Sequence, residues 1–407
     1  MIPREKLMAE ANRLRARTAK FLGDIVACPS HSGTEKRVAD RIRREMRAVG
    51  FDEVKIDKLG NVIGRIGRGR KVILYDSHID TVGVGDPAAW KGRNPFRLAA
   101  RDGYLWGRGA CDNKGSMACM VHGGGLLKRL GLTGDFTLYV TGSTFEEDCD
   151  GLGQEFLINK SIRKPHLVCL GEPTDLNVYR GHRGRMEIEV RTQGLSCHGS
   201  APERGVNAIY KMAPIVGDIE RLNERLSHRK DPFLGHGSVT ISQIRSTSPS
   251  LCAVADSSAI HLDRRLTVGD TLESAVAEIA SLDSVKRAEA TVTVLDYARP
   301  SYTGLVYPTK KYYPTWTVDE QHPAIAAAVA AGEYVLGRRP AVGKWTFSTN
   351  GIATCGLFHV PTVGFGPGHE IYAHSPDDQC PVDHLTEAAA FYAAFPGAFV
   401  RTRGGRR

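Results

Sequence analysis

Apolar and polar positions in the first 180 residues alternate between a helical period and short, continuous apolar runs. Residues 34–51 have the apolar spacing of an amphipathic helix, and residues 115–130 form a helical stretch rich in small side chains. Three apolar runs, at 71–80, 134–143 and 165–173, are typical of buried strands. Strands that alternate with helices predict an α/β unit whose mostly parallel sheet is covered by helices on both faces.

The pattern changes after about residue 183. Half-exposed strands are expected at 185–194, 237–246, 257–267 and 289–297, with helices at 205–226 and near 271–282. The order strand, helix, two strands, helix, strand predicts an α+β open-faced sandwich with one exposed sheet face. Helix, buried strand and helix return at 322–337, 360–368 and 386–400. We therefore expect residues 183–297 to be a domain inserted between the two parts, 1–182 and 298–407, of a first domain.

Composition narrows the class of protein. The chain has 407 residues, of which 42% are hydrophobic and 24% charged, as in ordinary globular proteins of about two domains. It has neither a run of about 18 apolar residues nor the apolar stretch of a secretory signal near its start. Nine scattered cysteines without a C-x-x-C pair predict reduced thiols rather than a disulfide framework or a zinc knuckle. A cytoplasmic protein with no membrane partner is expected.

The net charge of +9 admits a basic nucleic-acid-binding protein as one hypothesis. The basic residues interleave with acidic ones, however, and no nucleic-acid-reading motif is apparent. A solvated surface is the better interpretation, and an anionic substrate is a second possible cause of the charge.

Polar side chains follow each predicted strand of the first unit or a glycine-rich turn. They are His78, Asp80, Asp112, Glu146, Glu147, Glu172 and His374, with His369 nearby. Each alone has a structural explanation, such as a helix cap or a turn residue. Ligands of α/β sheets, however, bind beyond the carboxyl ends of the strands, so the set is expected to converge on one site.

Imidazole and carboxylate ligands together favour zinc, cobalt or manganese. Two histidines with several carboxylates exceed the needs of one tetrahedral ion and match two ions that share a bridging carboxylate and water. His78 and Asp80 are two residues apart and project the same way on an extended chain. One of them can therefore bind a metal while the other supports a ligand.

Five motifs, "SHIDTV", "GRGACDNKG", "TFEED", "GEPTD" and "AHSPDD", resemble in order and spacing those of the co-catalytic zinc amidohydrolases and peptidases. That family includes acetylornithine deacetylase, succinyl-diaminopimelate desuccinylase, aminoacylase and glutamate carboxypeptidase. The resemblance covers nearly the whole chain and is greatest to a branch of hydrolases linked to selenium metabolism. It implies a zinc-exopeptidase-like catalytic domain, with residues 183–297 as a lid and dimerisation domain.

The resemblance also implies the metal ligands. By its motifs, His78 and Glu172 bind one ion, Glu147 and His374 bind the other, and Asp112 bridges the two. The peptide that follows Asp112 resembles the family's cis peptide. Two divalent ions per chain are expected, with zinc first and cobalt or manganese as alternatives.

Other roles come from the same resemblance. Asp80 matches the carboxylate behind the metal-binding histidine, and Glu146 matches the general base. In the inserted domain, His198 of "SCHGSAPERGVNAI" takes the position that reaches a neighbouring active site and contacts the oxyanion, which implies a homodimer. Arg265 of "LDRRL" stands where family members bind a substrate carboxylate.

The sequence departs from the family pattern at two places. "PSLCAVADSS" has Cys252 or a neighbour where many relatives have asparagine, and "FSTNG" has Asn350 where aspartate is frequent. The first departure weakens any transfer of substrate contacts at that point.

The sequence thus predicts a metal-dependent hydrolase that cleaves an amide bond of a small substrate with a free carboxylate. N-acyl amino acid deacylase and dipeptidase or carboxypeptidase activities both remain open. The alternative from another class is a catalytically inactive, metal-binding dimeric relative, against which the presence of Glu146 argues. A nucleic-acid partner is not expected.

Overall fold

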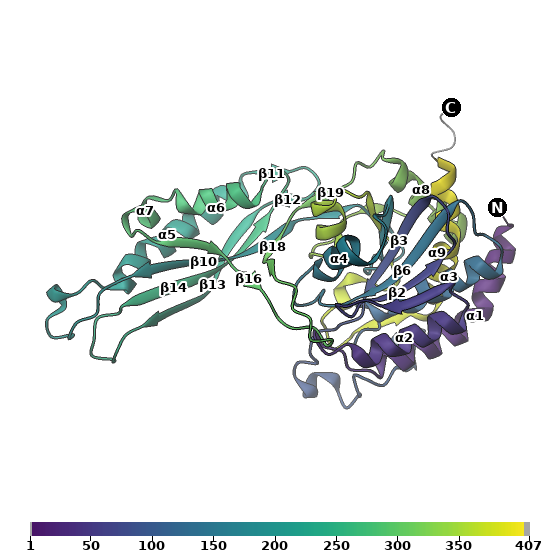
Figure 1. The fold of residues 1–407 in the computed structure, drawn as a ribbon, viewed down its shortest axis with the longest axis horizontal. Coiled ribbons are helices and arrows are strands. Elements are labelled where there is room, and N and C mark those ends of the chain that lie inside the picture. The colour runs from purple at the N-terminus through teal and green to yellow at the C-terminus, as the bar shows by residue number, and fades with distance from the viewer. Residues whose placement is uncertain (1, 403–407) are drawn as a thin grey trace.

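An eight-stranded sheet forms the centre of the larger unit in the computed structural model, which describes residues 2–402 (Figure 1). Its order is β1 (Glu53–Ile56), β2 (Val62–Ile66), β6 (Phe136–Ser143), β3 (Lys71–His78), β7 (Leu167–Leu170), β21 (Thr362–Gly364), β8 (Val178–Tyr179) and β20 (Val342–Gly343). The central strands β6, β3, β7 and β21 are parallel, whereas β1 and β2 add in antiparallel fashion at one edge. The predicted α/β class with a largely parallel sheet is confirmed.

Helices cover both faces of this sheet. They are α1 (Arg4–Val26), α2 (Lys36–Ala48), α3 (Lys114–Arg129), α4 (Leu152–Phe156), α8 (Pro323–Leu336) and α9 (Val382–Thr402). In α2 the buried residues Val38, Ile42 and Met46 recur every four positions, the period of one helical face. On β6, Gly142 faces Met117 of α3. The preceding residue, Thr141, accepts a hydrogen bond from Gln154 of α4. Since successive strand residues point to opposite faces, α3 and α4 lie on opposite sides of the sheet.

The second unit extends away from the first as a separate sheet with helices on one side (Figure 1). Its strands are β13 (Ser238–Thr247), β14 (Ser257–Leu266), β10 (Gly184–Gln193) and β15 (Thr291–Val294), in that order, with β18 (Tyr312–Tyr313) also paired to β10. Its helices are α5 (Ala208–Ser227), α6 (Leu272–Ala280) and α7 (Asp283–Arg287). Buried and half-buried residues alternate along β10, so one face of the sheet lies against the helices and the other is more open.

Each unit has its own hydrophobic core. One cluster of buried side chains draws on residues 7–178 and 297–399, and the other on residues 186–294. Because β18 joins the second sheet, the segment after residue 298 also contributes to the smaller unit. The domain boundaries at 182/183 and 297/298 stay predictions.

Smaller elements complete the fold. A three-stranded sheet joins β22 (Gln379–Pro381), β5 (Tyr104–Trp106) and β4 (Ala99–Arg101). Short two-stranded pairs are β11 (Lys230–Asp231) with β12 (Gly235–His236), β16 (Asp296–Tyr297) with β17 (Thr309–Lys310), and β19 (Trp316–Thr317) with β9 (Gly181–His182). All nine cysteines are free thiols. Within residues 2–402, no helix has the length and apolar character that crossing a bilayer requires.

Candidate metal centre and active site

The carboxyl ends of three parallel strands place the predicted site residues next to one another. His78 is the last residue of β3, the Glu146–Glu147 pair follows β6, and Glu172 follows β7. Asp112 lies just before α3, and the Asp112–Asn113 peptide is cis, as the resemblance implies. The convergence expected at this edge of the sheet is present.

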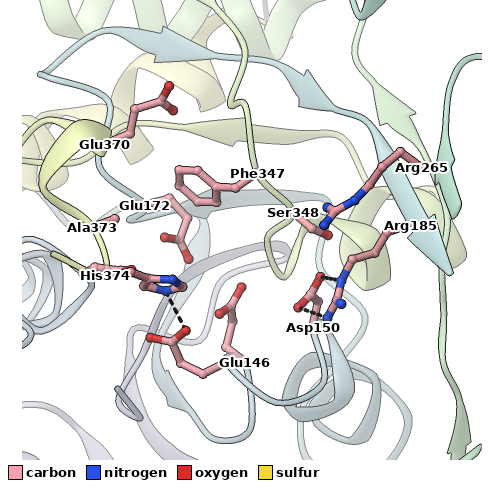
Figure 2. A pocket seen from close by; sticks show the side chains of 12 residues that line it. Glu146, Asp150, Glu172, Arg185, Arg265, Phe347, Ser348, Glu370, Ala373 and His374 are labelled. Carbon is pink, nitrogen blue, oxygen red and sulfur yellow. Dashed lines mark hydrogen bonds and ion pairs between the residues drawn. The ribbon is translucent and has the colours of Figure 1, made fainter. Parts of the chain in front are cut away.

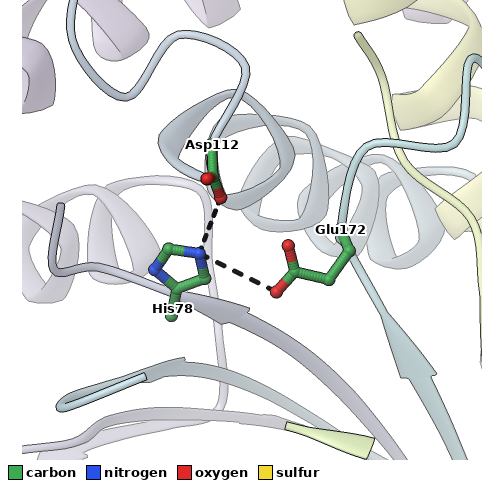
Figure 3. A group of neighbouring side chains, drawn as sticks. All are labelled: His78, Asp112 and Glu172. Atoms are coloured by element: carbon green, nitrogen blue, oxygen red, sulfur yellow. Dashed lines mark hydrogen bonds and ion pairs between the residues drawn. The ribbon is translucent and has the colours of Figure 1, made fainter. Parts of the chain in front are cut away.

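The first candidate ligand group consists of His78, Asp112 and Glu172 (Figure 3). Nε2 of His78 lies 2.9 Å from Oδ1 of Asp112 and 3.8 Å from Oε1 of Glu172. All three side chains are buried, and their ligand atoms lie within 4.8 Å of one another. They can therefore surround one cation.

The second candidate group consists of Asp112, Glu147 and His374. Nε2 of His374 lies 2.9 Å from Oε2 of Glu147 and 3.3 Å from Oδ2 of Asp112. Asp112 thus directs one carboxylate oxygen to each histidine. A shared carboxylate between two ligand groups is the geometry that a pair of bridged metal ions requires.

Asp80 ties two strand ends together behind this cluster. Its carboxylate lies 3.5 Å from Nδ1 of His78 and accepts hydrogen bonds from the backbone N–H groups of Glu146 and Glu147. The Ser32 hydroxyl donates a further hydrogen bond of 2.7 Å. Asp80 therefore orients the imidazole and also fixes the backbone of the adjacent glutamates, a function the sequence did not predict.

The electrostatics of the cluster favour a bound cation. Burial raises the pKa of Glu172 to about 8 and raises the pKa of Glu146 well above its ordinary range. Hydrogen bonds to Asp112 and Glu147 raise the pKa of His374 to about 10. Although burial opposes it, the charges of Glu146 and Glu172 raise the pKa of His78 well above its ordinary value. Without a cation, these closely packed side chains therefore tend to stay protonated. A divalent cation would take the place of the protons and neutralise the carboxylates.

A cavity of about 380 Å³ lies beside the cluster, within the size range of small-molecule sites (Figure 2). Its lining comprises Asp112, Glu146, Glu147, Asp150, Glu172, Arg185, Arg265, Phe347, Ser348, Glu370, Ala373 and His374. Oε2 of Glu146 lies 3.9 Å from Nε2 of His78, so this carboxylate faces both the candidate ligands and the cavity.

Two arginines from the smaller unit form the opposite wall of the cavity (Figure 2). Arg185 of β10 and Arg265 of β14 are direct partners in the antiparallel register, so their side chains lie on the same face. Arg185 is paired with Asp150, whereas Arg265 is 36% exposed and paired with Asp263. Two adjacent guanidinium groups facing an open cavity are suited to bind an anion.

The structure does not bring His198 to this cavity. Its side chain is exposed and Nδ1 accepts hydrogen bonds from the backbone and hydroxyl of Ser200. Its backbone forms an isolated bridge with Ala253, so the exposed Cys252 lies alongside. The action of His198 at a neighbouring active site, which the resemblance implies, stays a prediction.

Asn350 belongs to a buried network beneath the site. Its amide donates hydrogen bonds of 2.9 Å to Oδ2 of Asp76 and to Oγ of Ser143, while its oxygen accepts one from the backbone of Gly151. Burial raises the pKa of Asp76 to about 6 against the effect of its three side-chain hydrogen bonds. The amide of Asn350 is therefore complementary to an acid at residue 76, where a second acid would be repelled.

Asn350→Asp is expected to lower the free energy of unfolding at pH 7 by about 1–3 kcal/mol, because it removes two donors and crowds two buried carboxyls. Crowding raises the folded-state pKa of the pair above the unfolded value of about 4, so the loss should diminish as the pH falls toward 4. Denaturant unfolding of the metal-free protein between pH 4.5 and 7.5 measures both effects. Asn207→Asp makes the same change at the N-cap of α5, where aspartate is well tolerated, and serves as control. Equal stability of Asn350→Asp and wild type at pH 7 would contradict the expectation.

The sequence interpretation missed several residues of the cavity. Asp150 and Glu370 each lie four residues from a predicted site residue, a spacing that could have drawn attention to them. Arg185 is the second residue of β10, the first strand of the smaller unit, but only its pairing with Arg265 shows that it lies at the cavity. Phe347 and Ser348 lie in an irregular segment whose composition contains no functional signal.

The fold combines an α/β unit that carries both candidate ligand groups with a second, α+β unit that contributes two arginines to the cavity. A family model, peptidase family M20/M25/M40, matches residues 74–397. The chain belongs to this family, and the predicted kinship is confirmed.

Individual similarities extend over almost the whole chain. "Uncharacterized protein YgeY" of Escherichia coli (strain K12) is 50% identical over 401 residues, covering 98% of this chain and 99% of its own. The aminopeptidase PepT of Bacillus cereus superimposes with a TM-score of 0.71 at 19% identity, covering 95% and 99% of the two chains. The YXEP protein of Bacillus subtilis, described as a dinuclear metal binding peptidase of the M20 family, superimposes with a TM-score of 0.69 at 14% identity, covering 96% and 99%. The expected branch linked to selenium metabolism stays a prediction.

Proposed function

We propose that this protein hydrolyses an amide bond of a small substrate that carries a free carboxylate, with two divalent metal ions and Glu146 as general base. The observation that supports this most is the position of Asp112 between His78 and His374, with Glu146 facing the same cavity. Zinc is the first candidate, and cobalt and manganese suit the same ligands.

In this mechanism the two ions, once bound, supply Lewis-acid polarisation of the carbonyl and lower the pKa of water. Glu146 accepts a proton from the attacking water as the new C–O bond forms. It then returns that proton to the amide nitrogen as the C–N bond breaks. Asp80 holds the backbone of Glu146 during both transfers.

The substrates that share this chemistry are dipeptides and N-acyl amino acids. Screening the metal-loaded protein against both groups, and against carbamoylated amino acids, tests the proposal. Hydrolysis that requires metal and a free carboxylate supports it, and metal-independent retention on nucleic acid without hydrolysis contradicts it. Because the chain belongs to a peptidase family, dipeptides are the first substrates to test.

Arg265→Met is expected to raise KM about 10- to 100-fold for substrates with a free carboxylate, since hydrogen bonds to charged groups contribute about 1.5–3 kcal/mol. The same variant should hardly change KM for substrates whose carboxylate is replaced by a primary amide. Steady-state kinetics on the two substrate series gives the comparison. Arg191→Met, which removes an exposed arginine of β10 paired with Glu189, is the matched control. An equal rise for acid and amide substrates would remove Arg265 from carboxylate recognition.

A homodimer formed through the smaller unit, in which His198 serves the partner's site, is part of the proposal. The exposure of His198 and its absence from the cavity lining of its own chain support it. A monomeric holoenzyme with full turnover would overturn both the dimer and the role of His198.

We also propose a cytoplasmic location for the protein. The nine free thiols support it, because disulfides are rare in the reducing cytosol.

A further inference from the structure

Two charged residues of the recognised motifs, Arg108 of "GRGACDNKG" and Asp378 of "AHSPDD", belong to neither ligand group. Their side chains are 2% and 0% exposed, and Nη1 of Arg108 lies 3.1 Å from Oδ2 of Asp378. A fully buried ion pair is weak evidence for stability, because desolvation offsets most of the attraction. The reason for this buried ion pair therefore has to be sought in its contacts with neighbouring residues.

Arg108 connects three segments that carry candidate ligands. Its Nη1 also donates to the carbonyl of Ser375, at 3.2 Å, and its Nη2 donates to the carbonyl of Gly83, at 3.2 Å. Ser375 directly follows His374, and Gly83 lies in the segment that follows β3. Arg108 itself stands four residues before the shared ligand, so one guanidinium group joins all three segments.

Asp378 fixes the turn that leads into the shared ligand. Its carboxylate accepts hydrogen bonds from the backbone N–H groups of Gly109, at 2.6 Å, and Cys111, at 2.8 Å. Its carbonyl accepts a further hydrogen bond from Gly107. The backbone immediately before Asp112 is thus anchored to the segment that carries His374.

The two ligand groups depend unequally on this anchoring. His78 ends a central strand and is 1% exposed, so its sheet holds it in place. His374 is 58% exposed, lies outside every helix and strand, and has a left-handed backbone with φ of 59°. Its position relative to Asp112 therefore relies on the contacts of the following four residues.

We propose that Arg108 and Asp378 are positioning residues that hold His374 within reach of Asp112 and Glu147, and so set the affinity of the ion at that group. The inference rests on the proposed two-metal function. It predicts that loss of the ion pair weakens metal binding at the group that contains His374 and leaves binding at the group that contains His78 unchanged.

Metal titration of chelator-treated, full-length Arg108→Ala tests this, with Co²⁺ uptake followed by equilibrium dialysis and visible absorption. Wild type is expected to take up two ions. In the variant one of the two ions should bind about 10- to 100-fold less tightly, as when outer contacts of metal ligands are lost, while the other keeps its wild-type affinity. Turnover should recover at high metal concentration, which a misfolded protein would not show. Arg65→Ala, which removes a buried arginine of β2 paired with Glu53, is the control and should leave both affinities unchanged.

Equal weakening of both ions, or unchanged uptake of both, would overturn the inference. If Arg108→Ala does not fold, the isosteric variant Asp378→Asn tests the inference in the same titration. The carboxylate of Asp378 accepts hydrogen bonds from Arg108, Gly109 and Cys111, and the new amide N–H group would face one of these donors instead. Uptake of fewer than two ions by wild type would overturn the proposed function itself, and this inference with it.

Discussion

Glu146→Gln is expected to reduce turnover by about 10²- to 10⁴-fold while both metal ions stay bound. The substitution keeps the shape of a side chain that lines the cavity but removes its ability to take a proton. The ligand atoms of His78, Asp112, Glu147, Glu172 and His374 are left in place, so the loss should lie in kcat and not in metal content. Steady-state kinetics combined with metal analysis of the same sample separates the two.

Glu155→Gln is the matched control. Glu155 lies on α4, outside the cavity lining, and its carboxylate accepts a hydrogen bond from Tyr307. Its loss should leave turnover close to wild type. If Glu146→Gln retains full turnover, another group must move the proton, and the position of Glu146 beside His78 has a different purpose.

Removal of metal is expected to abolish hydrolysis and to destabilise the catalytic unit. Chelation leaves buried carboxyl groups with raised pKa values, as for Glu172, and no cation to neutralise them. Each ion at a concentration of about 100 times its Kd should add about 2.7 kcal/mol to the free energy of unfolding. Thermal unfolding with and without zinc, cobalt or manganese measures the effect.

Asp112→Ala gives the sharpest version of this experiment. Because Asp112 contacts both His78 and His374, its loss should weaken both ions together. Glu172→Ala, by contrast, should weaken only one, since Glu172 belongs to a single ligand group. Selective loss of one ion in Asp112→Ala would exclude a shared ligand.

The sequence indicated which polar side chains lie together at one edge of the sheet, but not the contacts that surround them. Polar residues after buried strands can be found from hydrophobic runs alone, because the carboxyl ends of parallel strands meet at one edge. The contacts of Asp80 with the Glu146 and Glu147 backbone could not be found in this way, since they join residues 66 and 67 positions apart. The same holds for Arg108, whose partner Asp378 is distant in the chain.

Two further features depend on register and burial. Arg185 and Arg265 become neighbours only through the pairing of β10 with β14, and a shift by one residue would direct one of them to the opposite face. The replacement of a frequent aspartate by Asn350 becomes understandable only beside the buried Asp76. His198 is absent from the cavity lining of its own chain, so its expected contact with a neighbouring active site stays a prediction.

By itself, therefore, the sequence determined the order of elements, the class of fold and the residue types of the two candidate ligand groups, because periodicity and motif spacing are local properties of the chain. The tertiary structure decided which oxygen of Asp112 faces which histidine and which arginines form the wall of the cavity. It also decided how Arg108 and Asp378 connect the segment after His374 to the turn before Asp112. These depend on side chains brought together from distant segments, and their contacts exist only once the sheet and its loops have packed.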